Sequence, residues 1–335
     1  MDRKINLKLE QLWKRGKDFL GVEVPIMGGA MTWVSESSLV SATSNSGAFG
    51  VLASGSMNAE QLKGYIEQTK AKTTKPFGVN IILINPKYQE LVDLCIQQNI
   101  SHIILAGGVP TDTQIAYILK ANIKVIAFAP NLSLAKRLVK NGVSALIIEG
   151  SEAGGHIGPV STSVLAQEIL PYIKDVPIFV AGGIGSGDII SMYLQMGASG
   201  IQIGTLLVCT NECIAHENFK NSFLKANARD AQSTVQIDNN FAVIPVRAII
   251  NQGTLNFVDF QKQVIADFNN GLYSTKQEAQ LKIEHYWAGA LRKAVVDGDV
   301  VNGSLMAGQS VGMVNDILPV EQLISRLIKQ ASDCL

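Results

Sequence analysis

The sequence has few cysteines and no excess of charge of either sign. Its 335 residues include four cysteines, and its 28 basic side chains equal its 28 acidic ones. The spacing of the cysteines matches neither a disulfide framework nor a common zinc site; they are Cys95, Cys209, Cys213 and Cys334. A balanced charge provides no field that would gather nucleic acid or anionic lipid. We therefore expect buried thiols, no bound metal and no nucleic-acid partner.

Long apolar runs are also missing. No uninterrupted apolar stretch reaches the about 20 residues of a membrane-spanning helix. Residues 1–19 are charged and amphipathic, unlike a signal peptide. The composition is 47% hydrophobic and 17% charged, which argues against a disordered chain and suits an enzyme with a large core. The sequence thus predicts a cytoplasmic protein without a membrane partner, and it allows a homodimer.

The sequence does contain short apolar runs that alternate with helical segments. The runs are too short for helices and lie at residues 24–30, 49–53, 77–83, 102–107, 124–129, 145–149, 177–181 and 200–204. Helical periodicity is found between them at 58–70, 87–98, 132–140 and 187–196. This alternation predicts parallel βαβ units. A doubly wound sheet would have fewer strands, so eight units favour a (β/α)8 TIM barrel over residues 1–210.

The alternation of strand and helix patterns stops after about residue 210. Helical patterns appear at 219–229, 257–271, 275–296 and 320–335, with little strand signal between them. We expect residues 211–304 to form a smaller, mainly helical cap that carries substrate or acts as a lid. The chain would rejoin the barrel at about 305–335. Such a cap would lie over the C-terminal mouth of the barrel, where barrel enzymes have their active sites.

Glycines cluster where the last three predicted strands end. Gly154 and Gly155 follow the run at 145–149, Gly182 and Gly183 follow 177–181, and Gly204 follows 200–204. Glycine lets backbone N–H groups approach a phosphate without interference from a Cβ atom. One glycine pair would indicate only a tight turn. Pairs after successive late strands favour a phosphate site, which such barrels build from their last two βα loops.

His156 directly follows the first glycine pair. His102, His216 and His285 have no comparable neighbours, and we interpret them as structural or surface residues. His156 lies in a loop at the predicted mouth, and imidazole titrates near neutral pH. We therefore expect it to transfer a proton or to orient the substrate.

Three further positions suit a cofactor at the mouth. The Asn80 amide, near the end of the run at 77–83, can hydrogen-bond a flavin ring or only cap a turn. Glu149 can bind a ribityl hydroxyl or remain a solvated strand-end carboxylate. Small residues at 28–30 would let a flat ring lie against the backbone. The small-residue run at 303–309 predicts a return of the chain to the barrel by close backbone approach.

These motifs resemble the nitronate monooxygenase-like flavoproteins, formerly 2-nitropropane dioxygenases, which include the type II enoyl-acyl-carrier-protein reductases. The resemblance covers about the whole chain, and its most specific part is Glu-Ala-Gly-Gly-His at 152–156. The other matching segments are residues 25–31, 75–80, 149–150, 181–184, 202–205, 246–248, 298–300 and 306–309.

The resemblance implies an FMN cofactor and an active-site histidine that corresponds to His156. The phosphate contacts correspond to Gly182, Gly183, Gly204 and Thr205. The ring and ribityl contacts correspond to Gly29, Met31, Asn80, Glu149, Gly154, Gly155 and Met306. The expected cofactor site also includes Gly28, Ala30, Ala153 and Gln202. The family's first strand commonly ends in Gln-Gly-Gly-Met, and this chain lacks that Gln, which removes one polar contact near the flavin.

Two activities are compatible with the resemblance. The block at 149–158 and the ending at 298–309 are similar to the reductases, which favours reduction of a 2-enoyl thioester by NADH or NADPH through FMN. His156 would then supply or steer the proton that reaches Cα. The alternative is a nitronate monooxygenase that oxidises alkyl nitronates with O2 at the same FMN site. A hypothesis of another class is a non-catalytic phosphate-ligand-binding barrel or a flavin-free isomerase.

Overall fold

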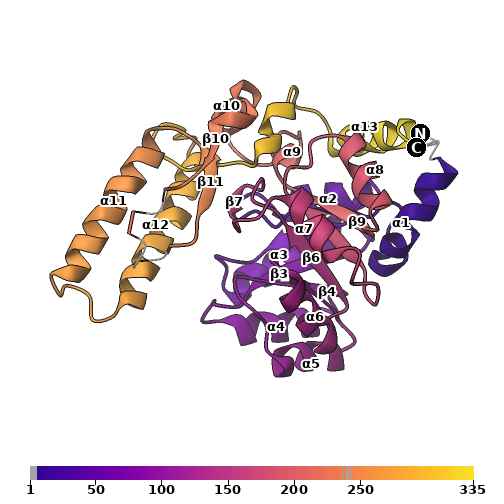
Figure 1. The fold of residues 1–335 in the computed structure, drawn as a ribbon, viewed down its shortest axis with the longest axis horizontal. Coiled ribbons are helices and arrows are strands. Elements are labelled where there is room, and N and C mark those ends of the chain that lie inside the picture. Colours follow the sequence, from indigo (N-terminus) through magenta and orange to yellow (C-terminus); the bar gives the residue numbers. More distant parts are fainter. Residues whose placement is uncertain (1–5, 236, 239–240, 242) are drawn as a thin grey trace.

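The computed structural model describes residues 6–335 except 236, 239–240 and 242. Among these residues, eight parallel strands form one sheet in the order β1-β9-β8-β6-β5-β4-β3-β2. They are β1 (Ile26–Gly28), β2 (Gly50–Ala53), β3 (Phe77–Ile82), β4 (His102–Ala106), β5 (Lys124–Phe128), β6 (Ala145–Glu149), β8 (Ile178–Ala181) and β9 (Gly200–Ile203). The sheet closes where the Gly28 N–H donates to the Phe49 carbonyl at 2.8 Å. The predicted (β/α)8 barrel is confirmed (Figure 1).

Strand alternation divides the apolar side chains between the barrel interior and its outer layer. A small buried cluster that includes Phe49, Val51, Ile104, Ile147 and Phe179 fills the interior. The alternate strand residues belong to a larger cluster shared with the surrounding helices. These helices are α2 (Ser37–Asn45), α3 (Ala59–Lys72), α4 (Tyr88–Gln97), α5 (Asp112–Lys120), α6 (Leu132–Lys140), α7 (Thr162–Ile169) and α8 (Gly187–Gln195). The sequence predicts α3, α4, α6 and α8 but not α2, α5 and α7.

The N-terminal end of the barrel is closed by α1 (Leu7–Leu20) and its following residues. A Cβ atom at Gly16 would lie 1.9 Å from the Ser199 carbonyl oxygen, so α1 contacts the barrel backbone directly. His102 lies buried there, with Nε2 3.1 Å from the Phe19 carbonyl oxygen. Burial, followed by the charge of Lys124, lowers the pKa of His102 to about 4. His102 is therefore a neutral structural residue, as the sequence predicts.

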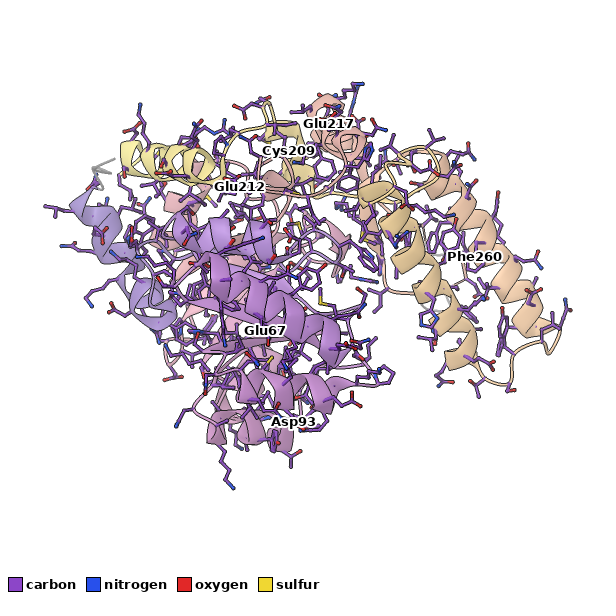
Figure 2. The ribbon with its side chains drawn as sticks, turned by 180° about the vertical axis from the view of Figure 1, so that it is seen from behind. Glu67, Asp93, Cys209, Glu212, Glu217 and Phe260 are labelled. Atoms are coloured by element: carbon purple, nitrogen blue, oxygen red, sulfur yellow. The ribbon has the colours of Figure 1, made fainter. Side chains whose placement is uncertain are left out.

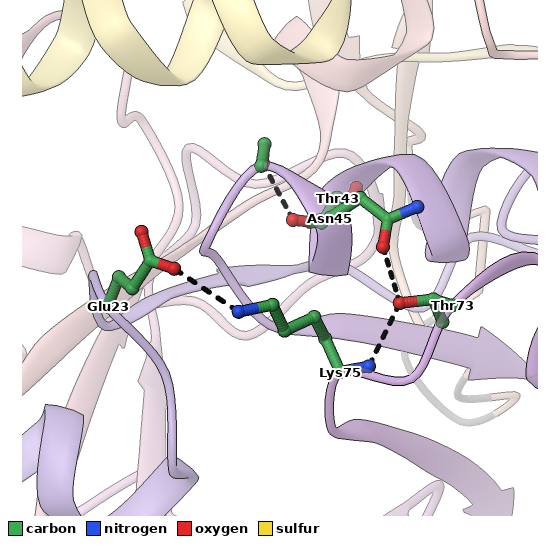
Figure 3. A network of polar contacts seen from close by, with 6 residues as sticks. Glu23, Thr43, Asn45, Thr73 and Lys75 are labelled. Atoms are coloured by element: carbon green, nitrogen blue, oxygen red, sulfur yellow. Dashed lines mark hydrogen bonds and ion pairs between the residues drawn. The ribbon is translucent and has the colours of Figure 1, made fainter. Parts of the chain in front are cut away.

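Polar contacts also fix the loops at this end (Figure 3). The Lys75 Nζ lies 3.4 Å from the Glu23 carboxylate, and the Lys75 N–H donates to Thr73 Oγ1 at 3.1 Å. Thr73 in turn donates to Asn45 Oδ1 at 2.5 Å. The network joins the segments before β1 and β3 to the C-terminal end of α2. It lies at the end of the barrel opposite the predicted mouth.

After β9 the chain leaves the barrel and forms a second group of elements. These are α9 (Thr205–Val208), α10 (Glu217–Lys225), β10 (Ala231–Ser233), β11 (Val246–Ile249), α11 (Gln252–Asn269), α12 (Lys276–Val295) and β12 (Leu305–Met306). Figure 1 shows α11 and α12 side by side, away from the barrel helices. Their contact is aromatic, because Phe260 of α11, labelled in Figure 2, stacks on Tyr286 of α12 with the ring centroids 4.5 Å apart. The helices predicted here are present, but the three short strands are not predicted.

The C-terminal helix α13 (Val320–Asp333) returns to the barrel. The Gln330 side chain accepts a hydrogen bond from the Gly187 N–H at 2.9 Å, and a Cβ at Gly187 would lie 2.2 Å from the Leu327 carbonyl oxygen. The Asn6 amide donates to the Ser332 carbonyl at 3.4 Å, so the start of α1 lies beside the C-terminal end of α13 (Figure 1). In the described part of the chain, no helix is long and apolar enough to cross a membrane.

Three of the four thiols are buried, as the sequence predicts, but Cys334 is exposed. The prediction fails there because Cys334 lies at the last turn of α13, and its Sγ contacts the Asp188 carboxylate at 3.0 Å. Among the described residues, no cluster of side chains could hold a metal ion.

Candidate active site

The carboxyl ends of four neighbouring strands lie at one level of the barrel. Glu149 of β6 is in register with Ala181 of β8, and Ala181 with Gln202 of β9. Gln202 is in turn in register with Met27 of β1. The segments that follow these four positions contain most of the predicted site residues, and the structure brings them together at the barrel mouth.

Three polar side chains face the barrel interior at this level. Residues two apart on a strand face the same side. Glu149 is two residues after Ile147, which lies in the interior cluster. Asn80 is two residues after Gly78, whose Cβ would point at the interior residues Phe49 and Ile104. Gln202 alternates with Ile201 and Ile203, which belong to the outer layer. A polar layer of Asn80, Glu149 and Gln202 therefore covers the apolar interior.

The polar layer retains free hydrogen-bonding capacity. The Asn80 amide donates to the Ile104 carbonyl at 3.2 Å, which leaves its oxygen available. Within the described residues, neither the Glu149 carboxyl nor the Gln202 amide has a hydrogen-bond partner. Burial raises the pKa of Glu149 to about 7. These unused donors and acceptors are available to a ligand at the mouth.

The loops after β6 and β8 pack backbone against backbone. Gly182 and Gly183 have φ angles of 92° and 71°, which favour glycine. A Cβ at Gly182 would lie 3.0 Å from the Gly150 carbonyl oxygen. Glu152 fixes the same loops, because its carboxylate accepts hydrogen bonds from the Thr162 N–H at 2.8 Å and its hydroxyl at 2.9 Å. The cradle at Gly182 and Gly183 is thus formed by backbone.

The run at 303–309 does return to the barrel mouth. The Gly308 N–H donates to Thr205 Oγ1 at 3.0 Å, and the Gln309 N–H donates to the Glu152 carbonyl at 2.9 Å. A Cβ at Gly154 would lie 2.6 Å from the Ala307 carbonyl carbon. Met306 approaches Gly155, since its Sδ lies 3.6 Å from the Cβ position there. The close backbone approach predicted from the small residues is confirmed.

His156 lies in a two-residue strand, β7 (Gly155–His156), that pairs with β11. Its register partner is Val246, and the Ile157 N–H donates to the Pro245 carbonyl at 3.0 Å. The His156 side chain is exposed. The pairing with β11 fixes the backbone of His156 at the barrel mouth.

Arg247 stabilises the loop before His156, a role that sequence reasoning missed. Its Nε donates to the Ser151 carbonyl at 2.8 Å and its Nη1 to the Ala231 carbonyl at 2.5 Å. Burial lowers the pKa of Arg247, and the charge of Glu152 opposes that shift. The only sequence signal was the match at 246–248, which carries no information on this contact.

The segment after β1 lies against the end of β9. The Gly29 N–H donates to the Ile203 carbonyl at 2.7 Å, and Met31 Sδ lies 3.3 Å from the Cβ position of Gly204. Ser35, which the sequence did not indicate, donates to the Gly29 carbonyl at 2.7 Å and accepts from the Met31 N–H at 3.0 Å. These bonds fix the small-residue segment at the mouth.

The remaining predicted residues lie in the same region. Gly28 and Ala30 flank Gly29, and Ala30 packs against the interior cluster. Ala153 is buried, and its N–H donates to the Gly150 carbonyl at 3.1 Å. A cavity of about 320 Å³ opens beside the glycine cradle, and its lining includes Glu152, Gly182, Gly183, Tyr193, Ser310 and Met313. Sequence reasoning did not identify Tyr193, Ser310 or Met313 as site residues.

The arrangement fits FMN on two grounds. Gly182 and Gly183 offer backbone N–H donors at the cavity of about 320 Å³ that they line. The unpartnered Glu149 and Gln202, together with the free Asn80 oxygen, provide donors and acceptors for a polar heterocycle and its ribityl chain.

The chain is similar to known proteins over nearly its whole length. The family model described as "Nitronate monooxygenase" matches residues 14–133 and 84–330. A (3aS,4S,5R,7aS)-5-hydroxy-7a-methyl-1-oxo-octahydro-1H-indene-4-carboxyl-CoA dehydrogenase from Rhodococcus jostii (strain RHA1) is 28% identical over 339 residues, 94% of each chain. A nitronate monooxygenase from Paraburkholderia phytofirmans (strain DSM 17436 / LMG 22146 / PsJN) is 25% identical over 359 residues, 93% of each chain.

A solved structure is also similar. The structure of FabK from Thermotoga maritima is 33% identical in sequence and has a TM-score of 0.84. The match covers 95% of this chain and 96% of the FabK chain.

Proposed function

Because this chain belongs to the nitronate monooxygenase family, whose members are FMN oxidoreductases, we propose that it reduces 2-enoyl thioesters with NADH or NADPH at the barrel mouth. The observation that supports this proposal most is the 33% identity to FabK, an enoyl-acyl-carrier-protein reductase II, over nearly both chains. The carboxyl-CoA dehydrogenase relative supports a thioester substrate independently, since its name specifies a CoA thioester.

The residues at the mouth would hold FMN from its phosphate to its ring. The N–H groups of Gly182 and Gly183 would bind the phosphate, with Gly204 and Thr205 at its other side. Glu149, Gln202 and Asn80 would bind the polar edge of the ring and the ribityl chain. Met31 and Met306, which lie against Gly204 and Gly155, would flank it. FMN bound there would carry a hydride between the nicotinamide and the substrate.

His156 would complete the reaction by protonating the substrate. Reduction of a 2-enoyl thioester adds a hydride to Cβ and a proton to Cα, while NAD(P)H becomes NAD(P)+. The proton is delivered most efficiently by an acid that is positioned at Cα. His156 is exposed at the mouth on a backbone that β11 holds, and a protonated imidazole could donate that proton.

We propose that residues 211–304 act as the substrate-carrying or lid portion of the enzyme. The support is the antiparallel pairing of β7 with β11, which joins this portion to the His156 loop. A CoA or acyl-carrier thioester is the proposed partner, and the homodimer and the cytoplasmic location stay predictions.

A nitronate monooxygenase is the second candidate, because the matching family model and the Paraburkholderia relative have that name. The same FMN site would serve, and His156 would orient an alkyl nitronate or deprotonate a nitroalkane.

Steady-state assays separate the two candidates. The proposal predicts NAD(P)H oxidation under nitrogen that depends on crotonyl-CoA and yields butyryl-CoA. Oxygen consumption with propionate 3-nitronate, without any thioester-dependent oxidation of NAD(P)H, would assign the chain to the monooxygenases. A purified protein without flavin would support the phosphate-binding barrel instead.

A further inference from the structure

Two buried side chains with hydroxyl groups line the cavity of about 320 Å³ beside the glycine cradle. They are Tyr193 on α8, which is 3% exposed, and Ser310, which is 4% exposed. In the described chain, neither hydroxyl has a hydrogen-bond partner. Because buried hydroxyl groups are normally hydrogen-bonded, these two indicate a ligand in the cavity that accepts hydrogen bonds from them.

The cavity is built by segments that lie far apart in the sequence. The short 3-10 helix η2 (Gln309–Met313) lies on the loop after β8, since a Cβ at Gly185 would be 2.3 Å from Met313 Cε. Its first N–H donates to the Glu152 carbonyl of the loop after β6 at 2.9 Å. These contacts hold η2 against both loops and thereby bring Ser310 to the glycine cradle.

The described lining of the cavity offers hydrogen-bond donors but no basic side chain. The N–H groups of Gly182 and Gly183 have no acceptor in the described chain. Burial, followed by the charge of Glu152, raises the pKa of Tyr193 to about 12, so its hydroxyl keeps its proton and can donate it to a hydrogen bond.

Glu152 is the one charged residue in the described lining, and its carboxylate already accepts two hydrogen bonds from Thr162. Its charge disfavours an anion in the cavity. A phosphate has three terminal oxygens that accept hydrogen bonds, and backbone N–H groups alone can cradle it. Beside a carboxylate and without a basic residue, a phosphate depends on the hydroxyl donors as well.

We propose that the hydroxyl groups of Tyr193 and Ser310 donate hydrogen bonds to the phosphate of FMN and take the place of a basic side chain there. This inference rests on the FMN site of the proposed function, and it adds two residues that the expected phosphate contacts do not include. Gly182 and Gly183 would satisfy part of the phosphate, and the hydroxyls would satisfy oxygens that remain. Because both hydroxyls would act at the phosphate, their loss should not change how the flavin ring is held.

Comparison of FMN with riboflavin, which lacks the phosphate, tests the proposal on the full-length chain after removal of its flavin. Tyr193→Phe and Ser310→Ala should each lower the affinity for FMN about tenfold or more, since a hydrogen bond to a charged group is worth about that much. The affinity for riboflavin should not change. Titrations that follow flavin fluorescence measure both dissociation constants. An unchanged ratio of the two constants, or an equal loss of affinity for both flavins, would overturn the proposal.

Two control variants remove buried hydroxyl groups elsewhere. Tyr88 on α4 and Ser332 on α13 have buried hydroxyls without a partner, and both lie outside the cavity. Tyr88→Phe and Ser332→Ala should keep the wild-type ratio of FMN to riboflavin affinity. A similar fall of that ratio in these controls would contradict a specific role for the two cavity hydroxyls.

The flavin titrations also separate this inference from the proposed function. If the ratio falls in Tyr193→Phe and Ser310→Ala but the wild type does not reduce crotonyl-CoA, the reductase fails and the phosphate contacts stand. If crotonyl-CoA is reduced and the ratio is unchanged, the assignment of the hydroxyls is wrong. Weaker binding of CoA to the flavin-loaded variants, with the ratio unchanged, would also overturn it in favour of a cavity that holds a phosphate of the substrate.

Discussion

At the residue scale, the carboxyl group of Glu149 has no polar partner in the described chain although it faces the barrel interior. Burial raises its pKa to about 7, so the folded ligand-free protein favours the protonated acid. Protonation of this carboxyl stabilises the folded state relative to the ionised form. That stabilisation is complete below pH 4.5, the pKa in the unfolded chain, and is lost as the pH rises through 7.

The first prediction follows from that pKa. In the flavin-free protein, Glu149→Gln should become more stable than the wild type as the pH rises from 4.5 to 8, by up to about 3 kcal/mol. Gln has the same shape but no charge to desolvate. Urea unfolding of both proteins across this range measures the difference. A difference that does not change with pH would show that the carboxyl is not desolvated.

His156 gives the second prediction. His156→Ala should retain FMN and lose most of its turnover, by about 100-fold or more, because proton transfer is typically worth that much. His285→Ala, which removes an exposed histidine on α12, is the matched control. Full turnover in flavin-loaded His156→Ala would remove the histidine from the mechanism.

At the element scale, the loops after β6 and β8 depend on glycine for two different reasons. Gly183 has a φ of 71° and borders the proposed phosphate cradle, whereas Gly271, with a φ of 78°, has no atom within 4 Å of its Cβ position. The two positions thus share the backbone strain that a side chain would introduce, but only Gly183 also contacts Glu152 in the proposed cradle.

The third prediction uses this pair. Gly183→Val should purify without FMN, because its side chain would press on Glu152, whose Cβ lies 3.2 Å from the Cβ position, and displace the loops that form the proposed phosphate cradle. Gly271→Val introduces the same kind of backbone strain and should keep its FMN. Flavin absorbance per protein, measured beside the melting temperature, distinguishes the two. Equal flavin content in both variants would move the phosphate site elsewhere.

The elements that the sequence predicts are those with strong local patterns. Runs such as 145–149 are β-branched and bounded by glycine, so every barrel strand was predictable. Helix α2 was not, because Ser37–Asn45 is mostly serine, threonine and asparagine; it begins where the Glu36 carboxylate accepts the N–H groups of Ser38 and Leu39. A side-chain cap of this kind stabilises a helix that apolar periodicity does not indicate.

The candidate site was predictable where its residues follow strands and unpredictable where distant segments meet. Asn80, Glu149 and Gln202 share one level because parallel strands align their carboxyl ends. The pairing of β7 with β11 joins residues 90 positions apart, and no local pattern specifies it: His156 and Val246 are the partners. Arg247, Tyr193 and Met313 were missed for the same reason.

At the scale of the whole molecule, the two ends of the barrel have different tasks. The N-terminal end is closed by α1, with the neutral His102 in contact with Phe19 and Phe49 at ring distances of 5.2 and 5.0 Å. The C-terminal end carries the polar layer and the glycine cradle. Substitutions at the N-terminal end should therefore change mainly the stability, and substitutions at the C-terminal end mainly the activity.

The fourth prediction concerns acid sensitivity. The pKa of His102 is lowered to about 4, so the unfolded chain binds a proton between pH 6.5 and 4 that the folded chain excludes. The stability from this residue is full above pH 6.5 and falls by up to about 3 kcal/mol as the pH drops to 4. Urea unfolding at pH 4.5 and 7 should show a smaller loss for His102→Gln than for the wild type. An equal loss in both would assign the acid sensitivity to other groups.

Anaerobic reduction of the purified protein tests the central claim most directly, with flavin absorbance followed as each candidate reductant is added. The account predicts that NADH or NADPH bleaches the flavin and that crotonyl-CoA restores its colour in the absence of oxygen. Bleaching by propionate 3-nitronate, with no response to either nicotinamide, would contradict the reductase and leave the monooxygenase.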